Sequence, residues 1–233
     1  MAQPRVDTNV VYGMVSGTRA VDGRSSSGHG RTDSASSSSH GSGWNAPLGY
    51  AAPPLKQSPQ VAMYAPSLLE AGYTVFAITH RATPTFRYPA PVDDAQRAVR
   101  FIRHNAARFG IDAARIGGSG GSSGAHLVSM LATMDGSGDS SDPDPVNRES
   151  AKLQCVVARA APVDLLRIDT SAGATAVALL LGARVDASTP KGTTEYKVAA
   201  AASPDHLRIA GRSADPAHSL AMPIGPCRFI NRR

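Results

Sequence analysis

Two serines lie in a glycine-rich segment, residues 117–124 (GGSGGSSG), where their surroundings could support nucleophilic chemistry. A serine hydroxyl attacks a carbonyl efficiently only when a base removes its proton and fixed donors stabilise the resulting oxyanion. Gly-x-Ser-x-Gly allows a sharp turn from strand to helix, which projects the serine and points backbone N–H groups at the oxyanion. Two frames fit, centred on Ser119 and Ser122. We take Ser122 as the candidate nucleophile because residues 124–132 (GAHLVSMLA) predict a helix directly after it, whereas Ser119 falls at a strand end.

The elements around this segment predict an α/β domain. Residues 74–78 (TVFAI) are typical of a buried strand, and apolar residues recur at three- and four-residue steps over 92–109, as in an amphipathic helix. Residues 115–118 and 153–158 predict two further strands. This alternation indicates a mostly parallel sheet flanked by helices in a single domain over residues 1–233.

Composition fits one domain without membrane spans. A chain of 233 residues with 42% hydrophobic residues can bury a full core. No stretch reaches the roughly 18 consecutive apolar residues of a membrane span, and the start lacks the layout of a signal peptide. We therefore expect a cytoplasmic protein, while secretion of a longer parent stays open. Cys155 and Cys227 are too few for a disulfide framework and indicate isolated thiols.

Charge and acidic residues give no sign of nucleic acid or metal. Residues 211–233 carry a net charge of +3 and residues 19–39 carry +1, so these segments supply four of the six excess positive charges. No basic helix face with interleaved aromatic residues appears, and nucleic-acid binding is the weak alternative. The acidic segment 135–144 (DGSGDSSDPD) does not match an EF-hand loop and predicts a polar surface loop. We expect neither a metal nor another cofactor.

Several motifs in a fixed order resemble a known family. Over residues 40–206 the chain is similar to the esterase and lipase group of α/β-hydrolases that includes hormone-sensitive-lipase-like and acetyl-xylan or feruloyl esterases. The matching segments are residues 40–44 (HGSGW), 88–90 (YPA) before 93–94 (DD), 115–117 (RIG), 120–127 (GGSSGAHL) and 161–165 (APVDL).

The resemblance implies a carboxylic-ester hydrolase of the α/β-hydrolase fold that works through a serine acyl-enzyme on a small-molecule ester. Ser122 matches the nucleophile. Backbone N–H groups of Gly41, Ser42 and Ser123 match the oxyanion hole, and His40 matches the histidine that supports its loop. Ser42 replaces the usual glycine of this loop but keeps the N–H.

The catalytic acid and base have no clear counterpart. In this fold the chain order is nucleophile, acid, histidine. His126 resembles the helix histidine after the nucleophile and is not expected to be the base, and Asp164 resembles a structural position. Residues after 206 supply neither group in recognisable surroundings. The remaining histidines are expected at the surface or in structural roles: His29, His80, His104, His206 and His218.

Two segments are consistent with a shifted reading frame, at residues 19–39 and after about 207. The family places an apolar strand before residue 40, where this chain has DSASSSS; one permitted back-translation, regrouped, encodes LGVIVI. Residues 222–232, regrouped, give DADRTVPFHQS, which resembles the family's acid-bearing loop. We therefore expect 19–39 and 207–233 to pack poorly and the fold to be incomplete at its C-terminus. An authentic serine-rich linker and basic tail is the alternative.

Two functional hypotheses remain. One is an ester hydrolase. The other is a catalytically defective hydrolase remnant that lacks the acid and histidine of the triad and has a non-enzymatic or binding role.

Overall fold

A six-stranded mixed sheet organises the fold, which a computed structural model describes for residues 5–15, 18–26, 35–39, 42–45 and 59–207. The strand order is β1-β2-β4-β3-β5-β6. β1 pairs antiparallel with β2, and β2 with β4, whereas the remaining three pairings are parallel. The strands are β1 Arg5–Val15, β2 Thr18–Ser26, β3 Ala35–Ser39, β4 Thr74–Ile78, β5 Gly117–Gly121 and β6 Cys155–Arg159.

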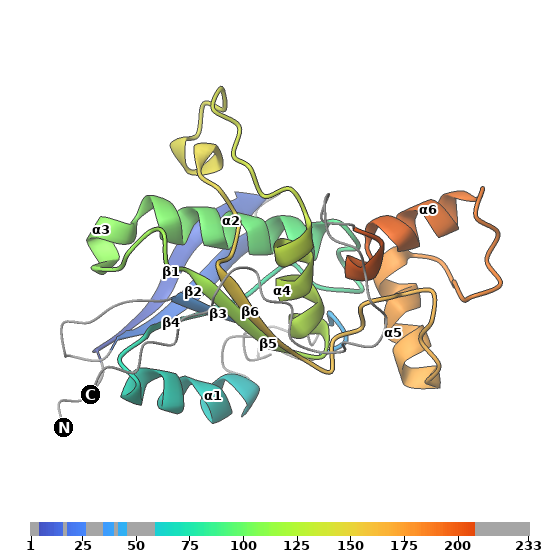
Figure 1. Cartoon of the computed structure of the whole chain (residues 1–233), viewed down its shortest axis with the longest axis horizontal. Helices are drawn as coiled ribbons and strands as arrows, with labels where there is room; N and C mark the ends of the chain where they lie inside the picture. The colour runs from blue at the N-terminus through green and yellow to red at the C-terminus, as the bar shows by residue number, and fades with distance from the viewer. Residues whose placement is uncertain (1–4, 16–17, 27–34, 40–41, 46–58, 208–233) are drawn as a thin grey trace.

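Helices cover the sheet and extend past one of its ends. α2 and α4 pack together on one side, and α1 lies on the other side (Figure 1). α5 and α6 lie beyond the carboxyl ends of β5 and β6 (Figure 1). The helices are α1 Pro59–Glu70, α2 Ala90–His104, α3 Ala106–Phe109, α4 Ser123–Thr133, α5 Ser171–Leu181 and α6 Thr194–Ala201, with short 3-10 turns η2 Pro145–Arg148 and η3 Pro204–His206.

The predicted central elements are present, with one difference. Every residue of β4 is buried, as its uninterrupted apolar sequence predicts. The helix predicted over 92–109 is instead two helices, because α2 ends at His104 and Asn105 separates it from α3. Gly110 closes α3 in the left-handed conformation, with φ of 64°, which glycine adopts without a Cβ penalty.

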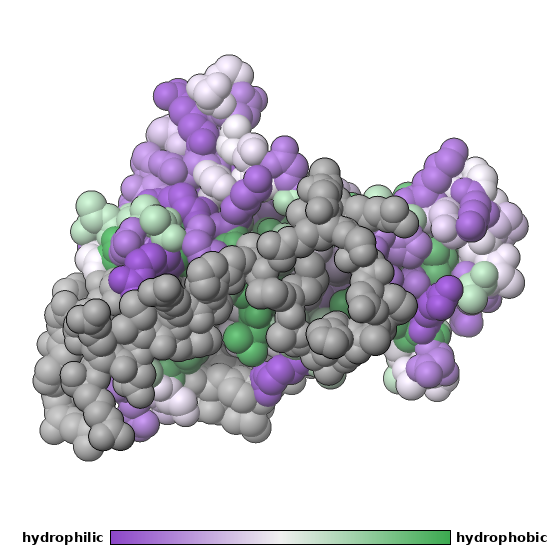
Figure 2. All heavy atoms as spheres, in the orientation of Figure 1, coloured by the Kyte–Doolittle hydropathy of each residue, from purple (hydrophilic) through white to green (hydrophobic). Residues whose placement is uncertain are grey.

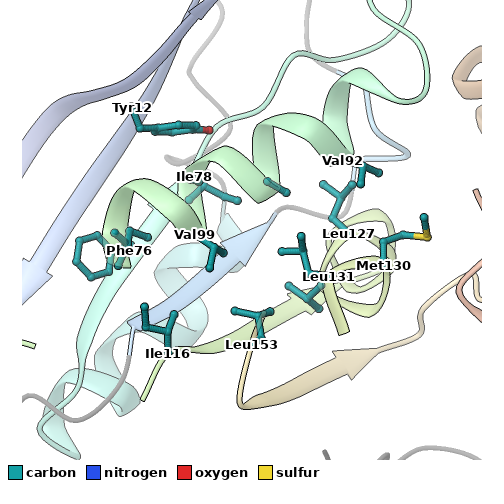
Figure 3. Packing of buried hydrophobic residues seen from close by; sticks show 14 of the residues in the cluster. Tyr12, Phe76, Ile78, Val92, Val99, Ile116, Leu127, Met130, Leu131 and Leu153 are labelled. Atoms are coloured by element: carbon teal, nitrogen blue, oxygen red, sulfur yellow. The ribbon is translucent and has the colours of Figure 1, made fainter. Parts of the chain in front are cut away.

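The hydrophobic core lies between the sheet and the pair α2 and α4. Leu127, Met130 and Leu131 of α4 face Val92 of α2, and Leu153 packs below them (Figure 3). Each of these five side chains is at most 3% exposed. α4 is therefore fixed against the sheet along its length, and the turn that begins it is fixed as well.

Parts of the segment 19–39, which we expect to pack poorly, lie in two strands of the sheet. Within it, β2 pairs with β1 and β4, and β3 lies between β4 and β5. Backbone N–H and C=O groups pair along a ladder whatever the side chains are, so a serine-rich segment can occupy a strand position. Residues 27–34 and 208–233 lie outside the described residues.

The acidic segment between α4 and β6 projects from the body, and hydrophilic residues gather over it (Figure 2). Its aspartates accept hydrogen bonds from nearby backbone N–H groups: Asp135 from Ser137 at 3.1 Å and Asp139 from Ser141 at 2.9 Å. The hydroxyls of Ser137 and Ser141 donate to the same carboxylates and, together with these backbone N–H groups, lower the pKa of both carboxyls. Among the described residues, no group of three or more histidine, cysteine or acidic side chains could hold a metal ion. Within the same residues, no helix is long and apolar enough to cross a bilayer.

Candidate active site

Ser122 occupies a strained turn between β5 and α4. Its φ of 51° and ψ of −121° lie in a region that L-residues other than glycine rarely adopt, at a typical cost of about 1–3 kcal/mol. The Ser122 N–H donates to the Arg159 carbonyl at 2.9 Å, and the Ser122 carbonyl accepts from the His126 N–H at 2.9 Å. The turn is thus held by β6 on one side and by the first turn of α4 on the other. The Ser122 side chain is exposed at the carboxyl end of β5.

Glycines allow α4 to approach β5 this closely. A Cβ added at Gly120 would lie 2.4 Å from the Gly124 carbonyl carbon and 2.7 Å from the Ala125 nitrogen. One added at Gly118 would lie 2.6 Å from Leu153 Cδ1. A side chain at Gly120 would push the backbone of α4 away from the strand, so the turn requires glycine there, whereas at Gly118 the nearest atom is the end of a side chain that can move.

The two candidate serines have different environments. Ser119 lies inside β5 and not at the strand end predicted for it, because the strand continues to Gly121; it is opposite Ser38 of β3 and Val157 of β6. Ser122 follows the strand and directly precedes α4. Of the two, Ser122 is the one at the strand-to-helix turn that the Gly-x-Ser-x-Gly pattern describes.

A tight loop at residues 42–45 lies against the start of α4. The Ser42 N–H donates to the Ser123 hydroxyl oxygen at 3.1 Å, so the structure brings two of the residues expected at the oxyanion hole together. The Ser42 hydroxyl donates to the Asn45 carbonyl at 2.7 Å. Gly43 and Trp44 both have positive φ, 63° and 60°, which turns the loop back on itself. His40 and Gly41, which the sequence also assigned here, lie outside the described residues.

The loop is anchored to the segment after β4. The Thr83 N–H donates to the Trp44 carbonyl at 2.9 Å, and the Thr83 hydroxyl donates to the Asn45 side-chain oxygen. Arg81, two residues before Thr83, forms an ion pair with Asp94 of α2, in which the guanidinium donates to a carboxylate oxygen at 2.8 Å. The hydrogen bonds to Asp94 raise the pKa of Arg81. Asp94 is 5% exposed, so the pair is largely shielded from water. α2 thereby positions the loop through a chain of polar contacts.

Trp44 and His126 make a buried contact between the loop and α4. The Trp44 Nε1–H donates to His126 Nδ1 at 3.1 Å, with the two rings perpendicular. His126 Nε2 lies 2.7 Å from the Ala202 carbonyl oxygen, directly after α6. Burial lowers the pKa of His126 to about 4, only partly opposed by the hydrogen bond to Ala202. His126 is therefore neutral at pH 7.

The fold and this turn agree with the comparison to known proteins. The BD-FAE family model matches residues 38–206, which include the loop, the turn and the end of η3. The chain belongs to the BD-FAE family.

Solved structures similar to this BD-FAE member are esterases of the α/β-hydrolase fold, which confirms the predicted fold class. An acetyl ester-xyloside bifunctional hydrolase from Caldicellulosiruptor lactoaceticus superposes with a TM-score of 0.63 and 25% identity, covering 81% of this chain and 62% of that one. A truncated carbohydrate esterase from gut microbiota superposes with a TM-score of 0.67 and 25% identity, covering 88% and 72%.

A curated relative matches over a shorter stretch. The ethyl acetate hydrolase of Pseudomonas putida is 40% identical over 65 residues, which make up 28% of this chain and 20% of that enzyme. The BD-FAE chain thus spans less than two thirds of the length of this enzyme and of the Caldicellulosiruptor hydrolase.

The other described histidines of this BD-FAE member have partners of their own. His206 Nε2 lies 3.4 Å from an Asp164 carboxylate oxygen, and His104 Nδ1 lies 3.5 Å from Glu149. His80 is buried, with Nδ1 2.8 Å from the Arg81 carbonyl oxygen. In the described part of the chain, no histidine ring is hydrogen-bonded to the Ser122 hydroxyl. His29 and His218 lie outside that part.

Sequence reasoning missed three residues that hold the BD-FAE site together. Thr83 and Ala202 contribute through a backbone N–H, a hydroxyl and a carbonyl, so no residue-type pattern indicated them. Trp44 lay inside a recognised motif, and a lone tryptophan beside a loop of small residues is a signal of a buried anchor.

Proposed function

We propose that the site is that of a carboxylic-ester hydrolase in which Ser122 forms an acyl-enzyme with a small-molecule ester. The observation that supports it most is the strained conformation of Ser122, which presents an exposed hydroxyl at the start of α4. Such strain at a non-glycine residue persists only where the surroundings hold it, and it concentrates at catalytic turns. Membership of the BD-FAE family agrees with this assignment.

In the proposed reaction, Ser122 Oγ bonds to the acyl carbon and the carbonyl oxygen becomes an oxyanion. Backbone N–H groups of Gly41, Ser42 and Ser123 stabilise that oxyanion, and His40 supports the loop that carries the first two. The alcohol leaves with a proton, and water then cleaves the acyl-serine bond. The Ser42 N–H, now donating to the Ser123 hydroxyl, exchanges this partner for the oxyanion. The reaction needs no cofactor and no nucleic-acid partner.

A base must remove the proton of the Ser122 hydroxyl, and the lack of such a base among the described histidines supports a second candidate function. The described histidines are engaged elsewhere, and both nitrogens of His126 have partners. We therefore keep a defective hydrolase remnant, with a non-enzymatic or binding role, as the alternative for this chain. In the first proposal the sequence regrouped after residue 207 contributes the acid-bearing loop, and the repaired chain must also supply the histidine.

A phosphonylating esterase probe with peptide mapping tests the nucleophile. We expect modification at Ser122 and not Ser119, because backbone N–H groups at the start of α4 favour the phosphonyl anion. Ser119→Ala is the matched control and should label normally, while Ser122→Ala should not label. Because a missing base slows labelling, the test is also made on a repaired chain, defined as one carrying the regrouped sequences and the missing acid and histidine. Labelling of Ser119 alone would overturn the assignment, and an unreactive repaired chain would overturn the proposed function.

A further inference from the structure

His126 is fully buried between three separate parts of the molecule. It lies on α4, four residues after Ser122, and is 0% exposed. One ring nitrogen contacts Trp44 of the oxyanion loop, residues 42–45, and the other contacts the Ala202 carbonyl after α6. A histidine that only filled the core could be replaced by leucine without leaving polar groups unpaired. Here that replacement would leave a buried indole N–H and a buried carbonyl without these partners.

The two contacts fix which tautomer the ring adopts. An indole N–H can only donate, so His126 Nδ1 accepts from Trp44 and carries no proton. A carbonyl oxygen can only accept, so Nε2 donates to Ala202 and carries the proton. A doubly protonated ring would direct an N–H at the indole N–H and lose the Trp44 contact.

We propose that His126 is the positioning residue of the oxyanion loop: its neutral Nε2–H ring holds Trp44 against α4 and ties both to the end of α6. Three observations support this role. Trp44 is 3% exposed, so the contact lies in the core. Trp44 and Gly43 both have positive φ, a backbone geometry that neighbouring contacts must maintain. Ser42, two residues before Trp44, has its N–H directed at Ser123 of α4.

Movement of Trp44 therefore moves the N–H proposed to hold the oxyanion. The catalytic consequence rests on the proposed function, since it assumes that an oxyanion forms beside Ser42. The structural part does not, because it concerns the indole and imidazole rings alone. The two parts can thus be tested separately on the full chain.

Other ionisable groups near α4 must be separated from His126. α4 carries no other ionisable side chain, and β3 and β5 carry none. β6, α2 and η3 also pack against α4, and the end of α6 contacts His126 itself. The ionisable residues of these four elements are Cys155, Arg159, Asp93, Asp94, Arg97, Arg100, Arg103, His104, Glu195, Tyr196, Lys197, Asp205 and His206. Among these, His104 and His206 are the other histidines, so His206→Asn and His104→Asn serve as controls.

Trp44 is the single tryptophan of the chain, so intrinsic fluorescence reports directly on the contact. At pH 7 we expect a red-shifted emission in His126→Leu and an unshifted one in His126→Gln, because glutamine retains one donor and one acceptor. On acidification, emission of the unsubstituted chain and of both histidine controls should change with a midpoint near pH 4, while far-UV circular dichroism follows folding in the same samples. The proposal would be overturned if the emission of His126→Leu showed no red shift. It would also be overturned if the emission of His126→Gln changed with the same acid midpoint as that of the unsubstituted chain.

If His126→Leu fails to fold, the variant Trp44→Phe tests the same contact from the other side. Phenylalanine keeps an aromatic ring and removes the N–H that His126 accepts. The neutral imidazole then loses a stabilising donor, so the pKa of His126, followed through its ring NMR signals, rises from about 4. An unchanged pKa would overturn the proposal.

The labelling rate of Ser122 tests the catalytic consequence. His126→Leu should slow phosphonylation by roughly 10- to 100-fold, as expected when catalytic geometry shifts by about an ångström, and His126→Gln should restore most of the rate. Equal rates in all three proteins would overturn the positioning role. If the full chain does not label at all, that result counts against the proposed function, and fluorescence still decides the contact.

Discussion

β5 and β3 are neighbours in the sheet, and both lack large apolar side chains; close packing accounts for a glycine of β5. β5 reads GGSGG, and Cβ atoms at Gly118 and Gly120 would overlap Leu153 and the first turn of α4. β3 reads ASSSS and pairs in parallel with β4 and β5. A strand at the centre of a parallel sheet is normally rich in valine, isoleucine and leucine. Backbone packing thus requires Gly120 of β5, whereas the sequence of β3 departs from the composition expected at its position in the sheet.

The two strands depart from the usual composition in different ways: β5 has a glycine that the Ser122 turn needs, and β3 has a run of serines where apolar residues are expected. The regrouped sequence LGVIVI has the apolar composition expected of β3. A shifted reading frame over residues 19–39 therefore stays our prediction. The nucleotide sequence around codons 19–40 and 205–233 checks it: insertions or deletions that restore the regrouped sequences are expected there, and their absence would favour an authentic serine-rich segment.

Repair of the frames should have the largest effect on activity. Without a histidine base held by an acid, an oxyanion hole retains an acceleration of about 10³–10⁴ over water, and the several further powers of ten from the triad are lost. The unrepaired chain should be a very poor esterase, and the repaired chain should hydrolyse p-nitrophenyl acetate. Ser122→Ala in the repaired chain should abolish this. The measurement is one assay on the three proteins at equal concentration.

The opposite result would identify a base. If the unrepaired chain hydrolyses the ester briskly and loses this on Ser122→Ala, a histidine already present serves Ser122. His206→Asn is then the first variant to measure, because His206 pairs with Asp164 at 3.4 Å and follows the nucleophile in the chain order of this fold.

Replacing a required glycine of β5 should have the next largest effect. In Gly120→Ala the new methyl would lie 2.4 Å from a backbone carbon of Gly124, so α4 must shift. We expect the free energy of unfolding to fall by about 3 kcal/mol or more, measured by urea denaturation. Gly192→Ala is the matched control, since nothing lies within 4 Å of a Cβ there, and it should change stability by less than about 0.5 kcal/mol. Equal effects would show that close packing does not explain the glycines of β5.

The sequence predicted the elements whose own residues determine them. Residues 74–78 formed a strand because an uninterrupted apolar run suits a buried position, and Gly110 closed a helix because glycine adopts the left-handed conformation without a Cβ penalty. The sequence did not reveal the break at Asn105 or the contact between Trp44 and His126, because both depend on segments brought together by folding. Nor did it indicate that β2 and β3 each pair with β4, since the backbone hydrogen bonds of a strand do not depend on its side chains. The roles of Ser122, Ser42 and Ser123 stay predictions.

The free energy of unfolding should depend on pH because His126 is buried in α4 without a proton on Nδ1. His126 has a pKa of about 4 when folded and about 6.5 when unfolded, so between these values the unfolded state binds the extra proton. The free energy of unfolding therefore falls as pH decreases through this window, by about 3 kcal/mol from this residue, and the loss levels off below pH 4. Urea denaturation at pH 7 and pH 4 measures the total loss, and the difference between the unsubstituted chain and His126→Gln isolates this part. A loss of the same size in His126→Gln would assign it to carboxylates instead.

The smallest effect should come from Ala160, which follows β6 beside the Ser122 turn. Ala160 has a φ of 51°, a left-handed conformation that costs an L-residue roughly 1–2 kcal/mol. Ala160→Gly removes that cost but increases the conformational entropy of the unfolded chain, so a net stabilisation of about 0.5–1 kcal/mol is expected. The adjacent Ala161 lacks a positive φ, so Ala161→Gly should destabilise by about the same amount. Urea denaturation of both variants checks the sign. If Ala160→Gly also destabilises the protein, the left-handed conformation of Ala160 is not strained. Packing would then determine the residue type at position 160 less strictly than it determines Gly120 of β5.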